Sequence, residues 1–488
     1  MRRATGEDQA PFEDGVRATS CAHDDDLLCS ADHILPRVTI ESLPDNVLLE
    51  IFEFCRHHSW LDWARRWYRL THVCQRWRYV VFASPLGLDL HLFCGASTPV
   101  RETLDVWPPL PIEIQSGSRD SELGDSIIAA LEHPDRIRML SLSKRSIPLE
   151  RLVTAMQKPF PALKFLLLES DVWTAPAPPD TFLGGFAPRL QSLTLKRIPL
   201  PTLPKFLLSC HGLSWLDISQ MPHAGYISPQ AMVTCISTLT RLMYLAIVFE
   251  SPTPYLDRRI RHPPPLTRAV LPSLTHVRFK GVSEYLEDVM ARIHTPFLDN
   301  VHVQFFNQLV FDIHQIPLLI SHAPLISSYN QAEIVFTPDC VAIELFLSIP
   351  TSRSLSWGIS CKGLDWQVSS MAQICGQFSF LLSGIEELRI QEGVALWEPT
   401  WQVDMDDAQW PELFHPFTSV QTLRICNRLR SPITSSLQAF GGELATEVLP
   451  ALDDLYLEGD QPSALEQQYI EPFITARQRS HHPVAVHR

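Results

Sequence analysis

The chain has 488 residues, of which 45% are hydrophobic, and it carries a formal net charge of −14 with an isoelectric point near 5.7. At roughly 100–200 residues per domain, this length allows two to four domains or one long repeat array. The acidic balance disfavours a nucleic-acid partner, because proteins that bind nucleic acid usually present a basic face. Eleven scattered cysteines without a C-x-x-C pair indicate free thiols in a reducing compartment.

The N-terminal stretch MRRATGEDQAPFEDG holds two arginines but no apolar core after them, which argues against a signal peptide. No run of 18 apolar residues occurs, so we expect no membrane span and no membrane partner. These features favour a cytoplasmic or nuclear protein. Residues 1–36 are polar and acidic and predict a disordered lead.

The stretch from 40 to 86 predicts two amphipathic helices. In the first, Ser42 is the expected capping residue, with Pro44 in the first turn and Asp45 completing a capping box. The second helix is predicted to run from Trp63 to Val81. Its apolar residues recur at steps of three and four, and its arginines lie on another face. The apolar side of the first helix consists of Leu43, Val47, Leu48, Ile51, Phe52 and Cys55.

The segment LPDNVLLEIF, followed some twenty residues later by VCQRWR, resembles an F-box, in particular that of fungal F-box proteins. The connection HHSWLDWARRWYR departs from that pattern, because it is longer and richer in tryptophan. The resemblance implies that residues 37–86 dock onto the Skp adaptor of a Skp–cullin–F-box ubiquitin ligase. The alternative is a local helical hairpin that packs on its own domain. The residues that match the adaptor-binding pattern are Leu43, Pro44, Val47, Leu48, Ile51, Phe52, Leu70, Val73, Cys74 and Trp77.

Residues 131–476 repeat an L-x-x-L-x-L unit, and the first seven units start 23 to 32 residues apart. This spacing brackets the period of leucine-rich repeats, in which each unit must stack on its neighbours to bury its apolar edge. About two units are degenerate between 299 and 384, with Leu325 and Leu355 as candidate starts. The ten matches start at Ile137, Leu163, Leu190, Leu213, Leu242, Leu274, Leu298, Ile385, Val420 and Leu452.

The clearest helical stretches between these strands are 151–157, 205–210, 229–240 and 282–293. Residues 87–130 are expected to connect and cap the array with two strands, and 477–488 form a tail. The predicted fold class is α+β. A small N-terminal all-helical F-box precedes an α/β leucine-rich-repeat solenoid, with a curved parallel sheet and helices outside.

The apolar positions of each unit face the core, so the intervening strand positions face the concave surface. Large side chains at these positions in consecutive units predict a target-binding surface, because aromatic residues and arginine are frequent interface hot spots. Two other segments, 251–268 and 395–410, are alternative target-binding places. The predicted target-binding residues are Trp215, Tyr244, His276, Arg278 and His302.

The sequence has no phosphate-binding loop, no G-x-S-x-G elbow and no H-E-x-x-H motif. Cys55, His57, His58, His72 and Cys74 match no standard zinc spacing. We therefore expect no catalytic residue, cofactor or metal. The predicted function is that of a non-enzymatic substrate-recognition subunit of a Skp–cullin–F-box ubiquitin ligase. The alternative is an F-box/leucine-rich-repeat scaffold without a role in ubiquitin transfer.

Overall fold

The computed structural model divides into two compact units, Met1–His58 and Ser59–Arg488, called unit 1 and unit 2 below. The expected lead 1–36 lies outside the described residues, as do most of the two candidate segments 251–268 and 395–410. The structure describes residues 39–56, 67–84, 88, 90–94, 100–115, 124–142, 149–170, 177–252, 267–311, 313–321, 329–347, 353–393, 409–438, 446–459 and 464–487.

Within its described residues, 39–56, unit 1 contains a 3-10 turn, η1 (Ile40–Ser42), and one helix, α1 (Asp45–Arg56). The predicted single helix capped by Ser42 is therefore wrong. Ser42 closes the 3-10 turn instead, since its backbone N–H and its hydroxyl both donate to the carbonyl of Thr39, at 2.9 and 2.7 Å. Pro44 disfavours a helical conformation of the residue before it, and Leu43 is extended (φ −68°, ψ 137°). The helix consequently starts only after Pro44.

The second half of the predicted F-box belongs to unit 2 and forms two short helices, α3 (Tyr68–Thr71) and α4 (Gln75–Ala83). The prediction of one continuous helix is wrong, and its expected start, Trp63, lies outside the described residues. Cys74 has an extended backbone (φ −156°, ψ 170°), and its Sγ accepts a hydrogen bond from the Trp77 N–H at 3.4 Å. Cys74 therefore caps α4 rather than lying on an apolar helix face.

An aromatic cluster joins α3 and α4 to the rest of unit 2. Trp67 is buried, and its indole N–H donates to the carbonyl of His91 at 2.7 Å. Its ring meets Phe82 and Trp107 edge-on, at centroid distances of 6.1 and 5.5 Å. Because His91 directly precedes the first strand of the sheet, these helices are attached to the start of the repeat array.

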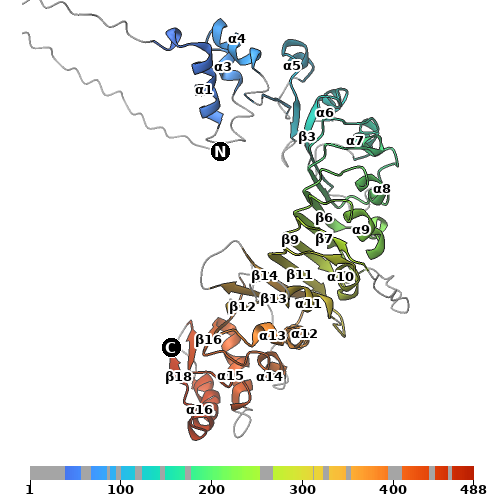
Figure 1. The fold of residues 1–488 in the computed structure, drawn as a ribbon. Coiled ribbons are helices and arrows are strands. Elements are labelled where there is room, and N and C mark those ends of the chain that lie inside the picture. Colours follow the sequence, from blue (N-terminus) through green and yellow to red (C-terminus); the bar gives the residue numbers. More distant parts are fainter. Residues whose placement is uncertain are drawn as a thin grey trace, which may run out of the picture. The chain divides into compact units, whose positions relative to one another are not determined.

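In the described part of unit 2, a 16-stranded sheet forms the core, and each of the ten predicted repeat units contributes one strand to it (Figure 1). A separate two-stranded sheet pairs β8 (Ala269–Val270) with β10 (Ile293–His294). The strands of the main sheet are β1 (Leu92–Cys94), β2 (Ile112–Gln115), β3 (Ile137–Leu142), β4 (Phe165–Glu169), β5 (Ser192–Lys196), β6 (Trp215–Met221), β7 (Tyr244–Phe249), β9 (His276–Gly281), β11 (Asn300–Phe306), β12 (Tyr329–Thr337), β13 (Cys340–Leu347), β14 (Leu355–Ser360), β15 (Glu387–Glu392), β16 (Thr422–Cys426), β17 (Asp454–Glu458) and β18 (Ala485–His487).

Helices between the strands cover one face of this sheet, and the other face is called the open face below (Figure 1). The second and third leucines of each L-x-x-L-x-L unit, such as Leu216 and Ile218 in β6, are buried between sheet and helices. This burial is the main stabilising contribution of each unit. The helices are α5 (Val100–Val106), α6 (Gly124–Leu131), α7 (Leu149–Ala155), α8 (Leu203–Leu207), α9 (Pro229–Ile236), α10 (Ser283–Met290), α11 (Gln315–Ser321), α12 (Leu364–Gln377), α13 (Ser379–Leu382), α14 (Gln409–Phe414), α15 (Arg430–Gln438) and α16 (Ala464–Arg479).

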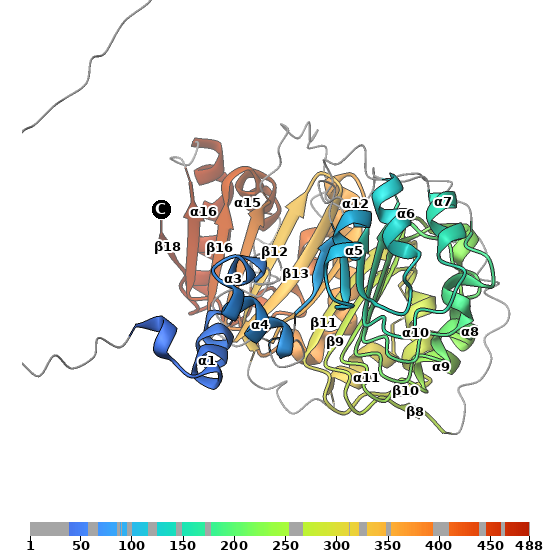
Figure 2. The ribbon, with the colours of Figure 1, turned by 90° about the horizontal axis from the view of Figure 1, so that it is seen from above.

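The sheet is not entirely parallel, which corrects the predicted architecture. A hairpin of β12 and β13 is inserted between β14 and β15, and β13 runs antiparallel to both of its neighbours (Figure 2). Its turn is closed by Thr337, whose hydroxyl accepts from the Cys340 N–H at 3.1 Å. Of the two expected degenerate starts, Leu355 does begin a strand, which pairs in parallel with β11, and Leu325 lies outside the described residues.

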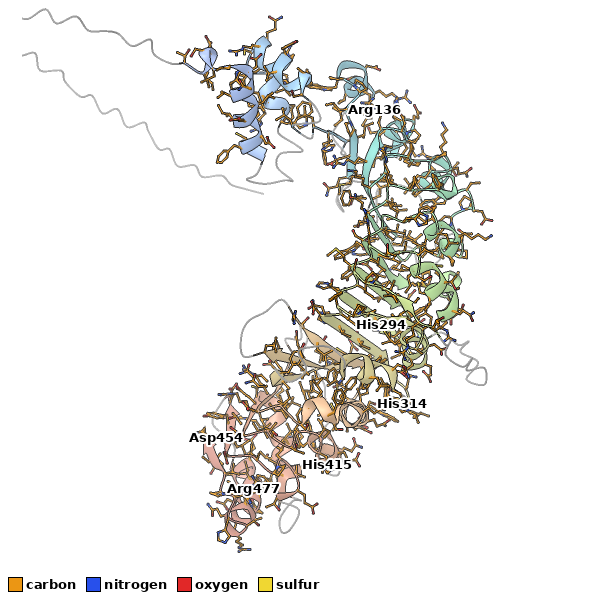
Figure 3. The ribbon with its side chains drawn as sticks, viewed as in Figure 1. Arg136, His294, His314, His415, Asp454 and Arg477 are labelled. Carbon is orange, nitrogen blue, oxygen red and sulfur yellow. The ribbon has the colours of Figure 1, made fainter. Side chains whose placement is uncertain are left out.

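The sheet also extends into both flanking segments. Its first two strands lie in the expected connecting segment, and β18 lies in the expected tail, where it pairs with β17. Arg477 in α16 is fully buried and donates to the carbonyls of Leu452 and Pro450, at 2.8 and 3.3 Å (Figure 3). The last helix is thus fixed to the loop before β17. Among the described helices, none has both the length and the apolar character needed to cross a membrane.

Candidate functional site

Three rows of side chains cross the open face between β6 and β14, because parallel strands in register place equivalent residues side by side. The five predicted target-binding residues lie in two of these rows. The first row contains Trp215, Tyr244 and His276, and the second contains Arg278 and His302. The five residues are therefore neighbours on four adjacent strands. Followed as far as β13, the rows are Trp215, Tyr244, His276 and Asn300; Asp217, Ala246, Arg278, His302, Ser356 and Glu344; and Val248, Lys280, Gln304, Gly358 and Ala342.

Trp215 and Tyr244 form the apolar part of this surface. Their rings stack at a centroid distance of 3.6 Å and an interplanar angle of 4°, and 39% of the Trp215 surface is exposed. Partial burial raises the pKa of the Tyr244 hydroxyl, and the neighbouring Asp217 carboxylate raises it further, while a hydrogen bond with Arg278 lowers it. Tyr244 is therefore a neutral phenol at physiological pH, and the stack is an uncharged aromatic platform.

The two histidines of the surface are held by polar neighbours. The Nε2 atom of His276 lies 3.0 Å from the Asn300 amide nitrogen. The two ring nitrogens of His302 lie 2.6 Å from the Ser356 hydroxyl and 2.9 Å from the Ser354 hydroxyl. Desolvation, followed by the positive charge of Arg278 and then by His276, lowers the pKa of His302. At neutral pH, His302 is consequently an uncharged imidazole with a fixed orientation.

A hollow of about 560 Å³ opens between these rows and β13. Tyr244 and His276 line one end, and Arg278 and Lys280 contribute positive charge. Gly358 lies at the other end, where the sheet strands approach so closely that an added Cβ would lie 2.7 Å from the Val341 carbonyl oxygen. The hollow thus combines aromatic, cationic and hydrogen-bonding groups.

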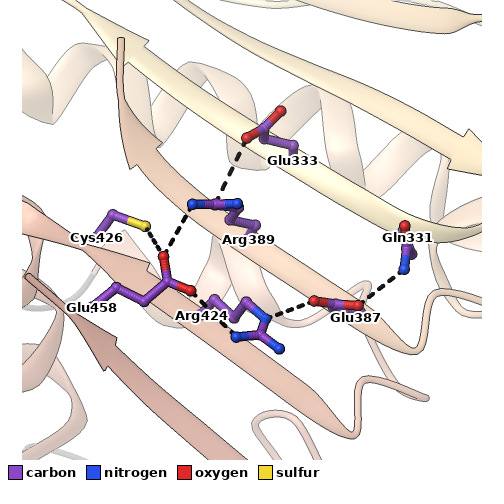
Figure 4. A network of polar contacts seen from close by, with 7 residues as sticks. All are labelled: Gln331, Glu333, Glu387, Arg389, Arg424, Cys426 and Glu458. Atoms are coloured by element: carbon purple, nitrogen blue, oxygen red, sulfur yellow. Dashed lines mark hydrogen bonds and ion pairs between the residues drawn. The ribbon is translucent and has the colours of Figure 1, made fainter. Parts of the chain in front are cut away.

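The open face over β12 to β17 carries a network of arginine and glutamate side chains (Figure 4). Arg424 binds Glu387 at 2.7 Å and Glu458 at 3.3 Å, and Arg389 binds Glu458 at 3.0 Å and lies 3.9 Å from Glu333. The Cys426 thiol donates to Glu458 at 3.0 Å, and this hydrogen bond, together with the two arginines, lowers the pKa of the Glu458 carboxyl. The positive charge in this half of the face is therefore neutralised by internal partners.

The repeat pattern alone did not predict this network. The signal was present, since Glu387, Arg389 and Arg424 occupy intervening positions of two predicted units. The partner Glu333 lies on β12, which was not predicted as a strand. A pairing across unpredicted strands cannot be recognised from repeat spacing alone.

In α1 and the two residues before Asp45, the predicted adaptor-binding residues divide into a buried and an exposed group. Leu48 and Phe52 are buried, at 0% and 1% exposure, and Leu43 and Val47 are partly buried. Pro44 and Ile51 are exposed, as is Phe54, which the prediction omitted although it follows Val47 and Ile51 at helical spacing. Val47, Ile51 and Phe54 thus form an accessible apolar stripe on this helix.

The predicted residues of α3, α4 and the turn between them are more accessible than those of α1, since none of them is buried. Val73 is 59% exposed, Cys74 is exposed, and Leu70 and Trp77 are partly buried. Tyr79, which the prediction also omitted, is 71% exposed. The ten predicted adaptor-binding residues are divided between the two units, so the structure does not define one joint surface for them, and their role stays a prediction.

Among the residues that the structure describes, no group of three or more histidine, cysteine or acidic side chains could hold a metal ion. Of the sequence set considered for zinc, Cys55 and Cys74 are exposed free thiols. His57 and His58 lie outside the described residues.

No protein-family model matches the chain, and no curated protein matches it. Among solved structures, the chain is similar to the leucine-rich repeat-containing protein LegL7 from Legionella pneumophila, at 13% identity and a TM-score of 0.29. That similarity covers 79% of this chain and 97% of the other. Values this low establish no family. The mixed α/β architecture with a long, mostly parallel sheet therefore rests on the strand order and register described above.

Proposed function

We propose that this chain is a non-enzymatic substrate-recognition subunit of a Skp–cullin–F-box ubiquitin ligase, acting in the cytoplasm or the nucleus. In this proposal the N-terminal helices dock the Skp adaptor, and the open face of the repeat unit captures a target protein. The chain supplies proximity and orientation, while ubiquitin transfer occurs on other subunits.

The observation that supports target capture most strongly is the set of large side chains on the open face between β6 and β14. Solenoid strands need polar residues there for solubility, but solubility does not require a stacked tryptophan and tyrosine beside an exposed arginine. Such side chains on an extended sheet surface are typical of protein-binding repeat arrays.

Support for adaptor docking comes from apolar residues on α1, on α4 and in the turn before α4. Ile51 and Phe54 are 37% and 66% exposed, and Val73 and Tyr79 are 59% and 71% exposed. Accessible apolar side chains grouped on short helices mark protein-interaction sites more often than they serve solubility. They also fall within the segment that resembles an F-box.

The test is co-purification from cells in which the proteasome is blocked. We expect the tagged wild-type chain to recover a Skp adaptor and a cullin, and the double variant Leu43→Ala, Pro44→Ala to lose both while keeping its thermal midpoint. Pro44 is exposed and Leu43 is only partly buried, so this change spares the core. The control is Lys158→Ala, which changes an exposed residue after α7, and this variant should recover both proteins. A wild-type chain that recovers the adaptor but no cullin would favour the alternative, an F-box/leucine-rich-repeat scaffold without a role in ubiquitin transfer.

A further inference from the structure

We propose that the hollow between β7 and β13 binds acidic side chains of an extended segment of the target protein. This inference rests on the proposed function of the open face as the target-binding surface. It adds the chemical class of the bound segment. The segment carries carboxylates that bind in the hollow and an apolar side chain that packs against the Trp215–Tyr244 stack.

The side chains that line the hollow are positively charged or neutral. Arg278 and Lys280 line it together with two histidines, and no aspartate or glutamate is among its lining residues. Among the described residues, neither Arg278 nor Lys280 forms an ion pair with a carboxylate. The acidic positions in the row of Arg278 are Asp217, two strands away on one side, and Glu344, three strands away on the other. In a chain with a net charge of −14, this is a local excess of positive charge.

Two arginines elsewhere on the open face provide an internal comparison. Arg389 and Arg424 each reach a glutamate within 3.0 Å, and both pKa values are raised by hydrogen bonds and neighbouring carboxylates. The sequence therefore supplies counter-charges where the arginines serve the sheet itself. For Arg278 and Lys280 on β9, the hollow contains no acidic side chain. This arrangement is expected where a binding partner brings the negative charge.

The dimensions fit a short extended peptide. Four strand steps separate β6 from β14, which corresponds to about 19 Å at the usual spacing between strands. An extended segment of about six residues spans that length. It would place one side chain on the aromatic stack and bring neighbouring carboxylates to Arg278 and Lys280, where ionised partners form the stronger hydrogen bonds.

The experiment measures direct binding of the purified full chain to a synthetic probe, a fluorescein-labelled peptide of alternating glutamate and phenylalanine. A matched peptide with glutamine in place of glutamate removes only the charge. We expect the glutamate peptide to bind at least about tenfold more tightly, and its affinity to fall as salt is raised from about 50 to about 300 mM. Equal binding of the two peptides would overturn the proposal.

Variants locate the site. Arg278→Glu and Lys280→Glu should each weaken binding of the glutamate peptide at least about tenfold, because each reverses one charge of the hollow. Lys158→Glu makes the same charge change at an exposed position after α7 and should leave binding unchanged. The milder Arg278→Gln, which removes the charge with little change in length, guards against a folding defect and should weaken binding in the same direction. Unchanged binding in Arg278→Gln and Lys280→Glu would overturn the proposal.

Nucleic acid is the competing ligand, since aromatic and basic side chains also bind single strands. A fluorescein-labelled oligothymidylate of equal charge should bind more weakly than the glutamate peptide, and the reverse order would overturn the proposal. The peptide assay contains no adaptor or cullin. Its failure with intact adaptor co-purification overturns only this inference, whereas failed co-purification with intact peptide binding overturns the ligase function.

Discussion

Trp215 and Tyr244 are paired in register on adjacent parallel strands, with ring planes 4° from parallel and centroids 3.6 Å apart. Register alone brings them side by side, because equivalent positions of successive units repeat along the sheet. The stack lies on the open face, so it stabilises the fold only modestly while presenting a large apolar surface.

The Trp215→Ala variant tests this division of roles. We expect it to lower the free energy of unfolding by about 1–3 kcal/mol, because it removes both the stacking contribution of the pair and the apolar area that Trp215 buries. Urea denaturation followed by far-UV circular dichroism measures the change, with Lys158→Ala as the exposed control. A loss above about 3 kcal/mol, typical of core truncations, would mean that Trp215 belongs to the core.

The stability of the chain should depend on His302 below neutral pH. Since the folded-state pKa of His302 is lowered from 6.5, the unfolded state binds more protons in the window below that value. Stability contributed by this residue is therefore complete above about pH 6.5 and is lost as the pH falls.

The His302→Asn variant, which keeps a hydrogen-bonding side chain, should show a smaller loss of stability between pH 7 and about pH 5 than the wild type does. Thermal midpoints of both proteins across this range measure the difference. Parallel pH profiles of variant and wild type would show that His302 titrates normally.

The Arg424–Glu387 pair at 2.7 Å should contribute little by itself, because about a third of each side chain is exposed. A double-mutant cycle with Arg424→Ala and Glu387→Gln is expected to give a coupling free energy of about 0.5–1 kcal/mol that decreases with salt. No coupling at low salt would contradict the network as drawn in Figure 4.

Thiol reactivity should separate the cysteines by burial. Burial raises the pKa of Cys375 to about 12, which leaves almost no thiolate at neutral pH, whereas Cys55 and Cys74 are exposed. Alkylation by iodoacetamide, followed by peptide mass spectrometry, should modify Cys55 and Cys74 in the native protein and Cys375 only in denaturant. Equally rapid native labelling of Cys375 would indicate that α12 opens readily.

Repeat spacing predicted the strands well because each unit carries its own apolar pattern. Leu216 and Ile218 are buried as expected, and Leu355 begins a strand within a region where the repeat is degenerate. The inserted hairpin was missed because its pattern has a period of two: Ala332, Ile334 and Phe336 are buried in alternation. That alternation, followed by a Pro-Asp turn, predicts a hairpin, but it does not match the L-x-x-L-x-L motif.

Boundaries of the N-terminal helices were predicted less well, since helical periodicity does not reveal where the backbone leaves the helix. The extended conformation of Cys74 interrupts a regular apolar pattern. The five residues predicted on the open face do lie side by side, because strand register is set by the repeat. What they bind is a property of the partner, which periodicity does not encode.

The most direct test of the account is the separation of two binding activities in one purified chain. The triple variant Trp215→Ala, Tyr244→Ala, Arg278→Ala and the double variant Leu43→Ala, Pro44→Ala are compared with wild type for binding to a purified Skp adaptor and to the target recovered by co-purification. We predict that the triple variant loses the target and keeps the adaptor, and that the double variant does the opposite. Loss of both partners in either correctly folded variant, or of neither in both, would contradict the account.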